Sequence, residues 1–308
     1  MSRYSFGLRH NHAPRHHDPV RRKSSRPARA AAVGTSRAPS TGAPLDTDGQ
    51  FVTMEGCFNF RDIGGYRATT GRLVRRGTIY RADALHRLTA TGRAGLTQLG
   101  IATILDLRTA DEVAAGPWQP PPQWPGRWRH LPLREATPDW SGLTADQAAD
   151  PELAIAHYTE TLRRGGPALV AVFSALCQPG ALPAVFHCAA GKDRTGIVAA
   201  LLLRLLGVDS QIVTADYALS DLATARWEAS VAAGTPDDTQ TAWAYVPPAM
   251  LTADKAIMSG FLDRIDAEYG SVDTLLLGHG LAPAAITRLR HALLTDDPER
   301  QLKNPVRA

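Results

Sequence analysis

A short apolar run, a loop of small residues and a long apolar helix follow one another between Ala184 and Leu206. The run from Ala184 to His187 has the length and composition of a strand. The segment from Thr195 to Leu206 is strongly apolar and long enough to be a buried helix. A strand that leads through a tight loop into such a helix favours an α/β fold.

The remaining patterns favour the same fold class. Ile101 to Leu107 is β-branched and apolar, as in a strand that is buried on both faces. Further strands are predicted near Phe58–Tyr66, Gly77–Arg81 and Trp128–Leu133. Helices are predicted from Thr89 to Leu99, from Asp111 to Gly116, over 151–164 and 166–177, and through most of 208–295 with breaks at 234–240 and Pro247-Pro248. We therefore predict an α/β fold with a small, largely parallel central sheet flanked by helices.

The net charge of +4 is concentrated at one end of the chain. Residues 1–44 hold nine of the 34 Lys and Arg residues but only one of the 30 acids, so the remainder carries more acids than bases. This segment is rich in Ala, Pro, Ser and His and has no apolar periodicity. It cannot bury enough surface to offset the entropy of ordering it. We predict a basic disordered tail over 1–45 and one folded domain over 46–308.

A tail of this charge could contact anionic lipid at a membrane surface, or nucleic acid. A solvated extension explains the composition without either, and we expect no nucleic-acid partner. The apolar stretch Ala30 to Val33 is too short for a signal peptide. No window approaches the roughly 20 apolar residues of a membrane-spanning helix, so the sequence predicts a soluble protein.

Three cysteines, Cys57, Cys177 and Cys188, cannot form a closed set of disulfides. No paired Cys or His spacing indicates a zinc site, and no metal is expected. A reducing, cytoplasmic location fits best, because it would keep a reactive thiol reduced. The sequence leaves the oligomeric state open.

The loop between the predicted strand and helix contains the residues with the clearest chemistry. Its amides lie at a helix start, where the N–H groups and the helix dipole favour an anion. The small residues Ala189, Ala190 and Gly191 allow these amides to converge on one ligand. Arg194 follows Cys188 by six residues and can hold two phosphate oxygens through its planar guanidinium. The loop is thus predicted to bind phosphate.

Cys188 is expected at the floor of this positive site. The amides, the helix dipole and Arg194 all favour its thiolate form. A thiolate beneath a bound phosphoryl group is placed for in-line attack, which forms a cysteinyl-phosphate intermediate. The alternative is that Cys188 is a buried structural cysteine and that Arg194 is part of an ion pair. The strand, the loop and the six-residue spacing together favour catalysis.

The segment His187-Cys188-Ala189-Ala190-Gly191-Lys192-Asp193-Arg194-Thr195-Gly196 resembles the loop of bacterial protein-tyrosine phosphatases, HCxAGKDRTG, some of which act on phosphoinositides. Five further segments are similar to that family in the expected order: Asn59–Gly65, Tyr80–Asp83, Leu105–Arg108, Tyr269–Val272 and Leu289–Leu294. The resemblance covers about 50–295. It implies a phosphatase-like fold with a helical insertion or lid after the catalytic helix, and a catalytic domain over 46–308.

The resemblance also implies the activity and the residues that perform it. The expected enzyme is a cysteine-dependent, metal-independent and cofactor-independent protein-tyrosine phosphatase, with dual specificity as an extension. Its substrate would be a phosphotyrosine-containing protein; a phosphoinositide phosphatase and a catalytically silent phosphate-binding scaffold are the alternatives. The phosphate would lie among Ala189, Ala190, Gly191, Lys192, Asp193, Arg194 and Thr195.

Expulsion of the leaving group also benefits from a proton donor. The family places an acid within the phosphate loop, which here is Asp193, and we prefer it. Asp106 is the second candidate, because it ends a buried strand, where functional groups of open α/β sheets gather. A structural partner for Arg108 is its alternative role. Asp139 is more typical of a turn.

For several residues in and after the loop, the sequence leaves two interpretations open. Lys192 would be either a second cation at the pocket rim or a solvated lysine. His187 would either hydrogen-bond near the Cys188 thiolate and adjust its reactivity, or be a packed structural histidine. Thr195 would either donate a hydrogen bond from its hydroxyl to the thiolate or cap the helix. Trp227, Trp243 and Tyr245, within a helical region over 211–250, would either cover an aromatic substrate or belong to the core.

Overall fold

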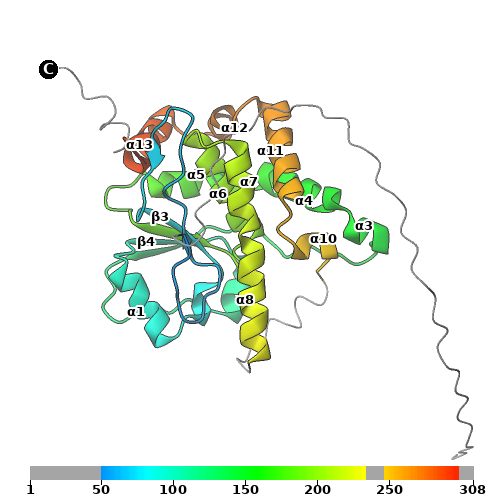
Figure 1. The fold of residues 1–308 in the computed structure, drawn as a ribbon, viewed down its shortest axis with the longest axis horizontal. Coiled ribbons are helices and arrows are strands. Elements are labelled where there is room, and N and C mark those ends of the chain that lie inside the picture. The colour runs from blue at the N-terminus through cyan, green and yellow to red at the C-terminus, as the bar shows by residue number, and fades with distance from the viewer. Residues whose placement is uncertain (1–49, 234–245, 298–308) are drawn as a thin grey trace, which may run out of the picture. The chain divides into compact units, whose positions relative to one another are not determined.

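The computed structural model describes residues 50–233 and 246–297, and Figure 1 presents their fold. A five-stranded sheet in the order β1-β3-β6-β4-β5 lies at its centre. The strands are β1 (Arg61–Asp62), β3 (Ile79–Ala82), β4 (Thr103–Asp106), β5 (Arg127–His130) and β6 (Ala184–His187). The predicted α/β class is confirmed. The predicted tail over 1–45 and the break at 234–240 lie outside the described residues.

Four of the five strands run parallel, and only β1 is antiparallel to its neighbour. The register aligns Ala82, His187, Asp106 and His130 across the sheet. The chain therefore leaves each parallel strand at the same edge. In open α/β sheets this carboxyl edge is where ligands bind.

Alternate strand residues face two different cores, as the pleat requires. Tyr80, Ile104 and Val185 pack with α1 (Ala90–Gln98) on one face. Ile79, Leu105 and Phe186 face the larger core on the other. Figure 1 shows α1 on one side of β3 and β4, and α5 and α6 on the other. Because both faces of the sheet are covered, the central strands have continuous apolar sequences.

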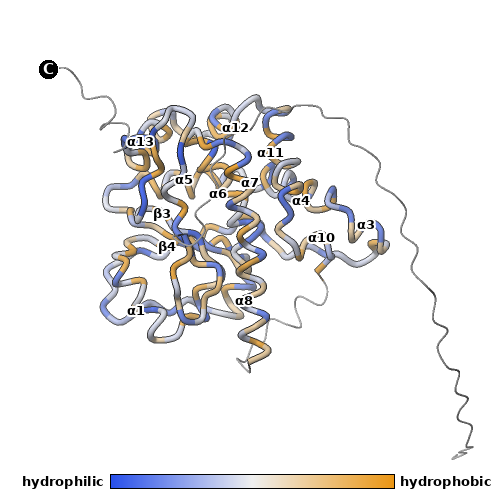
Figure 2. Tube along the Cα trace, in the orientation of Figure 1, coloured by the Kyte–Doolittle hydropathy of each residue, from blue (hydrophilic) through white to orange (hydrophobic). Residues whose placement is uncertain are grey.

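The larger core contains two strongly apolar helices. Figure 2 colours most of α5 (Gly166–Leu176) and α6 (Asp193–Leu205) as hydrophobic. The other helices on this side are α4 (Pro151–Arg164), α7 (Ser210–Ala218), α11 (Lys255–Tyr269), α12 (Val272–Gly278) and α13 (Pro283–Leu293). In α6 both Leu201 and Leu202 are fully buried, so this helix is held on nearly all sides.

Further helical elements of the described chain are the 3-10 helix η2 (Leu85–Arg87), α2 (Ala110–Ala115), α3 (Ala145–Ala149), α8 (Ser220–Ala232) and α10 (Pro248–Leu251). α7 and α8 run nearly end to end (Figure 1). Within residues 50–233 and 246–297, no helix combines the length and the apolar character that crossing a bilayer would require.

The structure corrects the sequence-based predictions at three places. Leu294–Thr295 is not helical; it forms β7, which pairs with β2 (Leu73–Val74) in a separate two-stranded sheet. The helix α3 was not predicted. The helix α6 begins at Asp193 rather than at Thr195, so Arg194 lies in its first turn. The reason for the first error is that β7 depends on a partner more than 200 residues away.

Candidate active site

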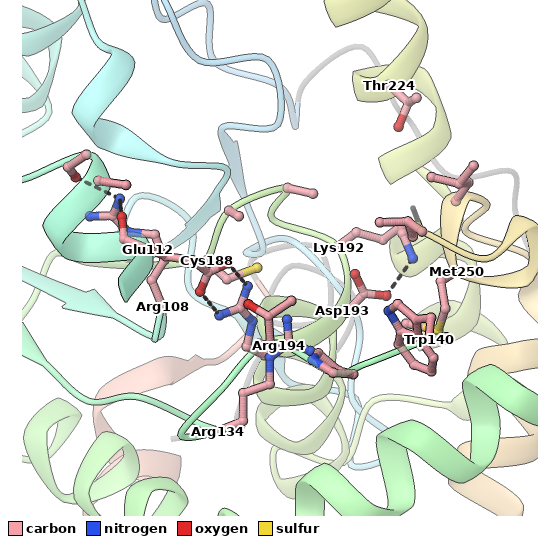
Figure 3. Close-up of a pocket in the computed structure, with 18 of the residues that line it drawn as sticks. Arg108, Glu112, Arg134, Trp140, Cys188, Lys192, Asp193, Arg194, Thr224 and Met250 are labelled. Carbon is pink, nitrogen blue, oxygen red and sulfur yellow. Dashed lines mark hydrogen bonds and ion pairs between the residues drawn. The ribbon is translucent and has the colours of Figure 1, made fainter. Parts of the chain in front are cut away.

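The loop between β6 and α6 forms the floor of a cavity of about 400 Å³. Six of the predicted site residues line it: Cys188, Ala189, Ala190, Lys192, Asp193 and Arg194. Figure 3 shows the Cys188 sulfur beside the Arg194 side chain, at the centre of the drawn residues. The cavity has the size of a small-molecule site. The structure thus brings the predicted nucleophile and the predicted phosphate-binding arginine into one cavity.

The loop turns its carbonyl groups away from the cavity. Four consecutive carbonyl oxygens, from Cys188 to Gly191, accept hydrogen bonds from groups outside the loop. The donors are, in order, His187 Nδ1 at 3.1 Å, the Ala84 amide at 2.9 Å, Asn59 Nδ2 at 3.0 Å and Arg81 Nη2 at 2.8 Å. Because a peptide group points its N–H opposite to its C=O, this arrangement directs the loop amides inward.

The inward amides are available to a ligand. Within 50–233 and 246–297, none of the amides from Ala189 to Asp193 donates a hydrogen bond to the protein. They are joined by the free amides and the positive dipole end of α6, which begins at Asp193. Successive free N–H groups at a helix start form an anion site. The loop thus presents unpaired amides to the cavity that Cys188 lines.

Gly191 is required at its position for two reasons. Its φ of +69° lies in the left-handed region that other residues rarely adopt. A Cβ placed there would also lie 2.5 Å from the carbonyl oxygen of Ala82, at the end of β3. The loop therefore approaches the neighbouring strand more closely than any side chain permits.

A buried ionic network supports the loop from behind. Asp216, on α7, accepts a hydrogen bond from Arg81 at 2.7 Å and another from Arg61 at 3.2 Å. Burial alone would raise the pKa of Asp216, but the two arginines lower it, so the carboxylate stays ionised. Arg61 also donates to Asn59, and Arg81 to the carbonyl of Gly191. The segments Asn59–Gly65 and Tyr80–Asp83 thus shape the phosphate loop.

Glu112 positions Arg194, and sequence reasoning missed it. Its carboxylate accepts Arg194 Nη1 at 2.5 Å and Nη2 at 2.7 Å, a bidentate pair. Burial would raise the pKa of Glu112, but the hydrogen bonds and charge of Arg194 lower it to about 2. This depressed pKa means that the pair contributes stability above the unfolded-state pKa and loses it only as pH falls towards 2. Arg194 therefore remains held throughout the neutral range.

A local signal for Glu112 does exist in the sequence. Thr109 and Glu112 form a capping box at the start of α2, with Glu112 Oε2 accepting the Thr109 amide at 2.7 Å. The pattern Thr-x-x-Glu predicts such a cap. It does not predict that the same carboxylate also faces an arginine 82 residues away.

Asp193 lies in the cavity wall with a fixed side chain. Its Oδ1 accepts hydrogen bonds from Lys192 Nζ at 2.5 Å and from the Tyr158 hydroxyl. Burial acts to raise the pKa of Asp193, but the charge and hydrogen bond of Lys192, together with the bond from Tyr158, lower it. Lys192 is itself buried and paired, so it is not the solvated rim lysine of the alternative interpretation.

Asp106 lies outside the cavity lining. It is fully buried and binds Arg108 through Nη2 at 2.7 Å and Nε at 3.0 Å. Burial acts to raise its pKa, but His187 and Arg108 lower it to about 2. The His187 Nε2 atom is 3.6 Å from Asp106 Oδ2. In this position Asp106 serves as the structural partner of Arg108, and Arg108 rather than Asp106 faces the cavity.

Thr195 and Asp139 are also placed by the structure. The Thr195 hydroxyl is buried and has no hydrogen-bond partner among the described residues, and the helix N-cap is Lys192, so Thr195 does not cap α6. Asp139 is exposed and accepts the Ser141 amide at 2.8 Å, the hydrogen bond of a turn.

The upper wall of the cavity comes from segments far apart in sequence. Trp140, Val246, Met250 and Leu251 supply apolar surface. Thr224, on α8, also lines it, so the region after α6 does cover the site. Trp227 is not among the lining residues, and Trp243 and Tyr245 lie outside the described part of the chain. In the described part, no group of three or more His, Cys, Asp or Glu side chains could hold a metal ion.

Comparison with known proteins yields a family and several relatives. A model of the tyrosine phosphatase family matches residues 52–295. The triple specificity protein phosphatase PtpB of Mycobacterium tuberculosis is 31% identical over 286 residues, which covers 78% of this chain and 98% of PtpB. A putative tyrosine-protein phosphatase of Cupriavidus necator is 30% identical over 225 residues, which covers 71% of this chain and 80% of that protein.

Among solved structures, the crystal structure of TpbA from P. aeruginosa in complex with pTyr matches at 15% identity. The match covers 77% of this chain and 100% of TpbA, with a TM-score of 0.33.

Proposed function

The chain belongs to the tyrosine phosphatase family and is a phosphoric monoester hydrolase; we propose that it uses Cys188 as nucleophile and Asp193 as proton donor, with phosphotyrosine as the preferred substrate and phosphoserine and phosphothreonine as slower ones. One observation carries this proposal: the inward amides of the loop, the Arg194 guanidinium and the Cys188 sulfur line one cavity. These are the groups that phosphoryl transfer requires, because its catalysis rests on positioning and charge stabilisation.

In the first step the Cys188 thiolate attacks phosphorus in line with the leaving oxygen. The sulfur–phosphorus bond forms while the bond to the leaving oxygen breaks, and Asp193 gives its proton to that oxygen. The loop amides and Arg194 bind the three equatorial oxygens, where negative charge is spread in the transition state. Glu112 keeps the guanidinium in the required plane through its two hydrogen bonds.

In the second step the same groups act in reverse. The Asp193 carboxylate takes a proton from water, the water oxygen attacks phosphorus, and the sulfur–phosphorus bond breaks. Lys192 and Tyr158 stabilise the ionised form of Asp193 that this step needs. In the first step, the negative charge of the bound substrate favours the protonated form of Asp193.

The cavity walls favour an aromatic leaving group. Trp140, Val246 and Met250 present apolar surface above the loop, against which a phenyl ring would be desolvated. The smaller side chains of phosphoserine and phosphothreonine reach the loop but leave much of this surface uncovered. The name of the relative PtpB, a triple specificity phosphatase, supports turnover of more than one substrate class.

The substrate preference is tested with one peptide sequence phosphorylated on tyrosine, serine or threonine, and with phosphatidylinositol phosphates in vesicles. We expect kcat/KM for the phosphotyrosine peptide to exceed the serine and threonine values by about tenfold or more. Turnover of the lipids alone would replace this proposal with a phosphoinositide phosphatase. If reduced protein hydrolyses none of these substrates, it is a phosphate-binding scaffold.

The role of Asp193 is tested by Asp193→Asn with two aryl phosphates. We expect hydrolysis of phenyl phosphate, a poor leaving group, to slow about 100-fold, and hydrolysis of p-nitrophenyl phosphate to slow much less. A carboxyl group loses its proton as pH rises, and because the pKa of Asp193 is lowered, its protonated fraction is already declining at acidic pH. The advantage of the wild type over the variant on phenyl phosphate should therefore be greatest near pH 5 and shrink towards pH 8.

Two matched variants complete this experiment. Asp139→Asn changes an exposed aspartate beside the cavity wall and should leave both rates near those of the wild type. Asp106→Asn breaks a buried ion pair and should lower the melting temperature instead. If Asp106→Asn, rather than Asp193→Asn, shows the dependence on leaving group, Asp106 is the acid.

We place the protein in the cytoplasm. Its three cysteines are free, and a reducing compartment keeps the Cys188 thiol in its active form. The proposed chemistry requires no metal ion or organic cofactor.

A further inference from the structure

Arg134 lines the active-site cavity but has no acidic partner. It follows β5 by four residues and reaches the same cavity as Arg194, as Figure 3 shows. Within 50–233 and 246–297 no carboxylate lies within 4 Å of its guanidinium nitrogens, and its buried Nε has no hydrogen-bond partner. Arg134 as a whole is half-buried, and a buried guanidinium nitrogen without a partner is uncommon, because desolvated charged groups are usually paired.

Among the described residues, the side chain that holds Arg134 is His157. Its Nε2 lies 3.1 Å from Arg134 Nη1, so the guanidinium donates and the imidazole accepts. Burial and the charge of Arg134 lower the pKa of His157 to about 4, which keeps the ring neutral near pH 7. Trp140 packs edge-on against His157 with ring centroids 5.1 Å apart. His157 therefore positions Arg134 without neutralising it.

The other cations of the cavity are already paired. Arg194 binds Glu112, Lys192 binds Asp193, and Arg108 binds Asp106. Burial and the charge of Arg194 lower the pKa of Arg134 to about 10, so it still carries its charge at neutral pH. In the proposed function, the loop amides and Arg194 bind the phosphoryl group above Cys188. The positive charge of Arg134 is available in addition to these groups.

Arg134 comes from a different part of the chain than the phosphate loop does. The loop and Arg194 come from β6 and α6, whereas Arg134 belongs to the wall that continues through Thr137, Pro138 and Trp140. Arg134 and these three residues line the same cavity as the loop. A cavity of about 400 Å³ has room for a ring and a second substituent.

We propose that Arg134, held by His157, binds a second anionic group on the same ring that carries the scissile phosphate. The ligand class is a ring phosphomonoester, aromatic or polyol, with a further phosphate or carboxylate. The inference rests on the proposed function, in which the Cys188 loop binds the phosphate to be transferred. The guanidinium would donate two hydrogen bonds to the second group through its planar fork, one of them from an Nη atom that His157 leaves free.

The test compares phenyl phosphate with 1,3-phenylene bisphosphate, which share a ring and differ by one phosphate. In the wild type we expect kcat/KM to be about tenfold higher for the bisphosphate. Arg134→Gln should reduce the bisphosphate value tenfold to a hundredfold more than the monophosphate value, and Arg134→Lys should retain part of the preference. A parallel pair, myo-inositol 1-phosphate and an inositol bisphosphate, identifies which kind of ring carries the second group.

A matched variant and a binding measurement keep the result interpretable. Arg129→Gln changes an exposed arginine on β5 outside the cavity and should preserve the preference. If Arg134→Gln does not fold, titration of the Cys188→Ser protein with phenyl phosphate and phenylene bisphosphate measures the same preference with Arg134 intact. Tighter binding of the bisphosphate supports the inference, and equal binding overturns it.

The remaining outcomes are also decisive. Equal losses on both substrates in Arg134→Gln would mean that the residue serves the transferred phosphate or the fold, and would overturn the inference. Wild-type protein that hydrolyses phenyl phosphate without preference for any second anion would overturn it as well. Wild-type protein that hydrolyses no phosphomonoester would refute the proposed function itself, which is a different failure.

Discussion

Replacement of Cys188 by serine is expected to reduce the turnover of p-nitrophenyl phosphate by about 10⁵-fold or more. The serine hydroxyl occupies nearly the same volume as the thiol, but it is not ionised at neutral pH and attacks phosphorus poorly. The loop amides and Arg194, which bind the phosphate, are unchanged. The variant should therefore bind phosphotyrosine about as well as the wild type does. Steady-state rates and titration calorimetry measure these two properties separately.

Cys177→Ser is the matched control for this experiment. Cys177 caps the end of α5, where its Sγ lies 3.4 Å from the carbonyl oxygen of Ala285, away from the cavity. Its substitution should leave kcat within about twofold of the wild type. Substantial turnover by Cys188→Ser would show that another residue is the nucleophile. Loss of both turnover and phosphotyrosine binding would mean that Cys188 also shapes the loop.

Arg194→Lys is expected to lower kcat/KM by about 10³-fold, although the positive charge is retained. A lysine presents a point charge and cannot bind two phosphate oxygens in the plane of a fork. It also loses one of the two hydrogen bonds to Glu112, so the cation is no longer held in a single orientation. Because the transition state gains most from this arginine, kcat should fall more than KM rises.

The control lies on the same helix. Arg204→Lys changes an arginine near the end of α6, where Nη1 donates to the carbonyl of Val208 at 3.2 Å, and should have little effect on the rate. If Arg194→Lys retains more than about a tenth of the wild-type kcat/KM, charge alone is sufficient and the bidentate role is wrong.

The fold class and the phosphate loop were predictable because both are encoded locally. Cys188 directly follows an apolar strand and Arg194 lies six residues later in the first turn of an apolar helix, so local sequence was enough to predict that both line one cavity. Period and composition likewise located β4, β6, α4 and α5 within a few residues. At these positions local preference and tertiary structure agree.

The contacts that complete the site are long-range, and no local pattern contains them. Glu112 meets Arg194 across 82 residues, and Tyr158 meets Asp193 across 35. Arg134 lies in the loop after β5 and His157 on α4, and the two segments meet only in the fold. The strand β7 was not predicted for the same reason, since its two residues adopt the strand conformation only by pairing with a distant partner.

The outward hydrogen bonds of the phosphate loop have a consequence for how such an enzyme is inactivated. The carbonyls of Ala190 and Gly191 are held by Asn59 and Arg81, which precede the loop by more than a hundred residues and contact no reacting atom. Catalytic competence is therefore a property of two stretches of chain, and an intact Cys-x5-Arg signature is insufficient to establish it. A sequence that keeps the signature but has lost this distant scaffold would belong among the inactive relatives.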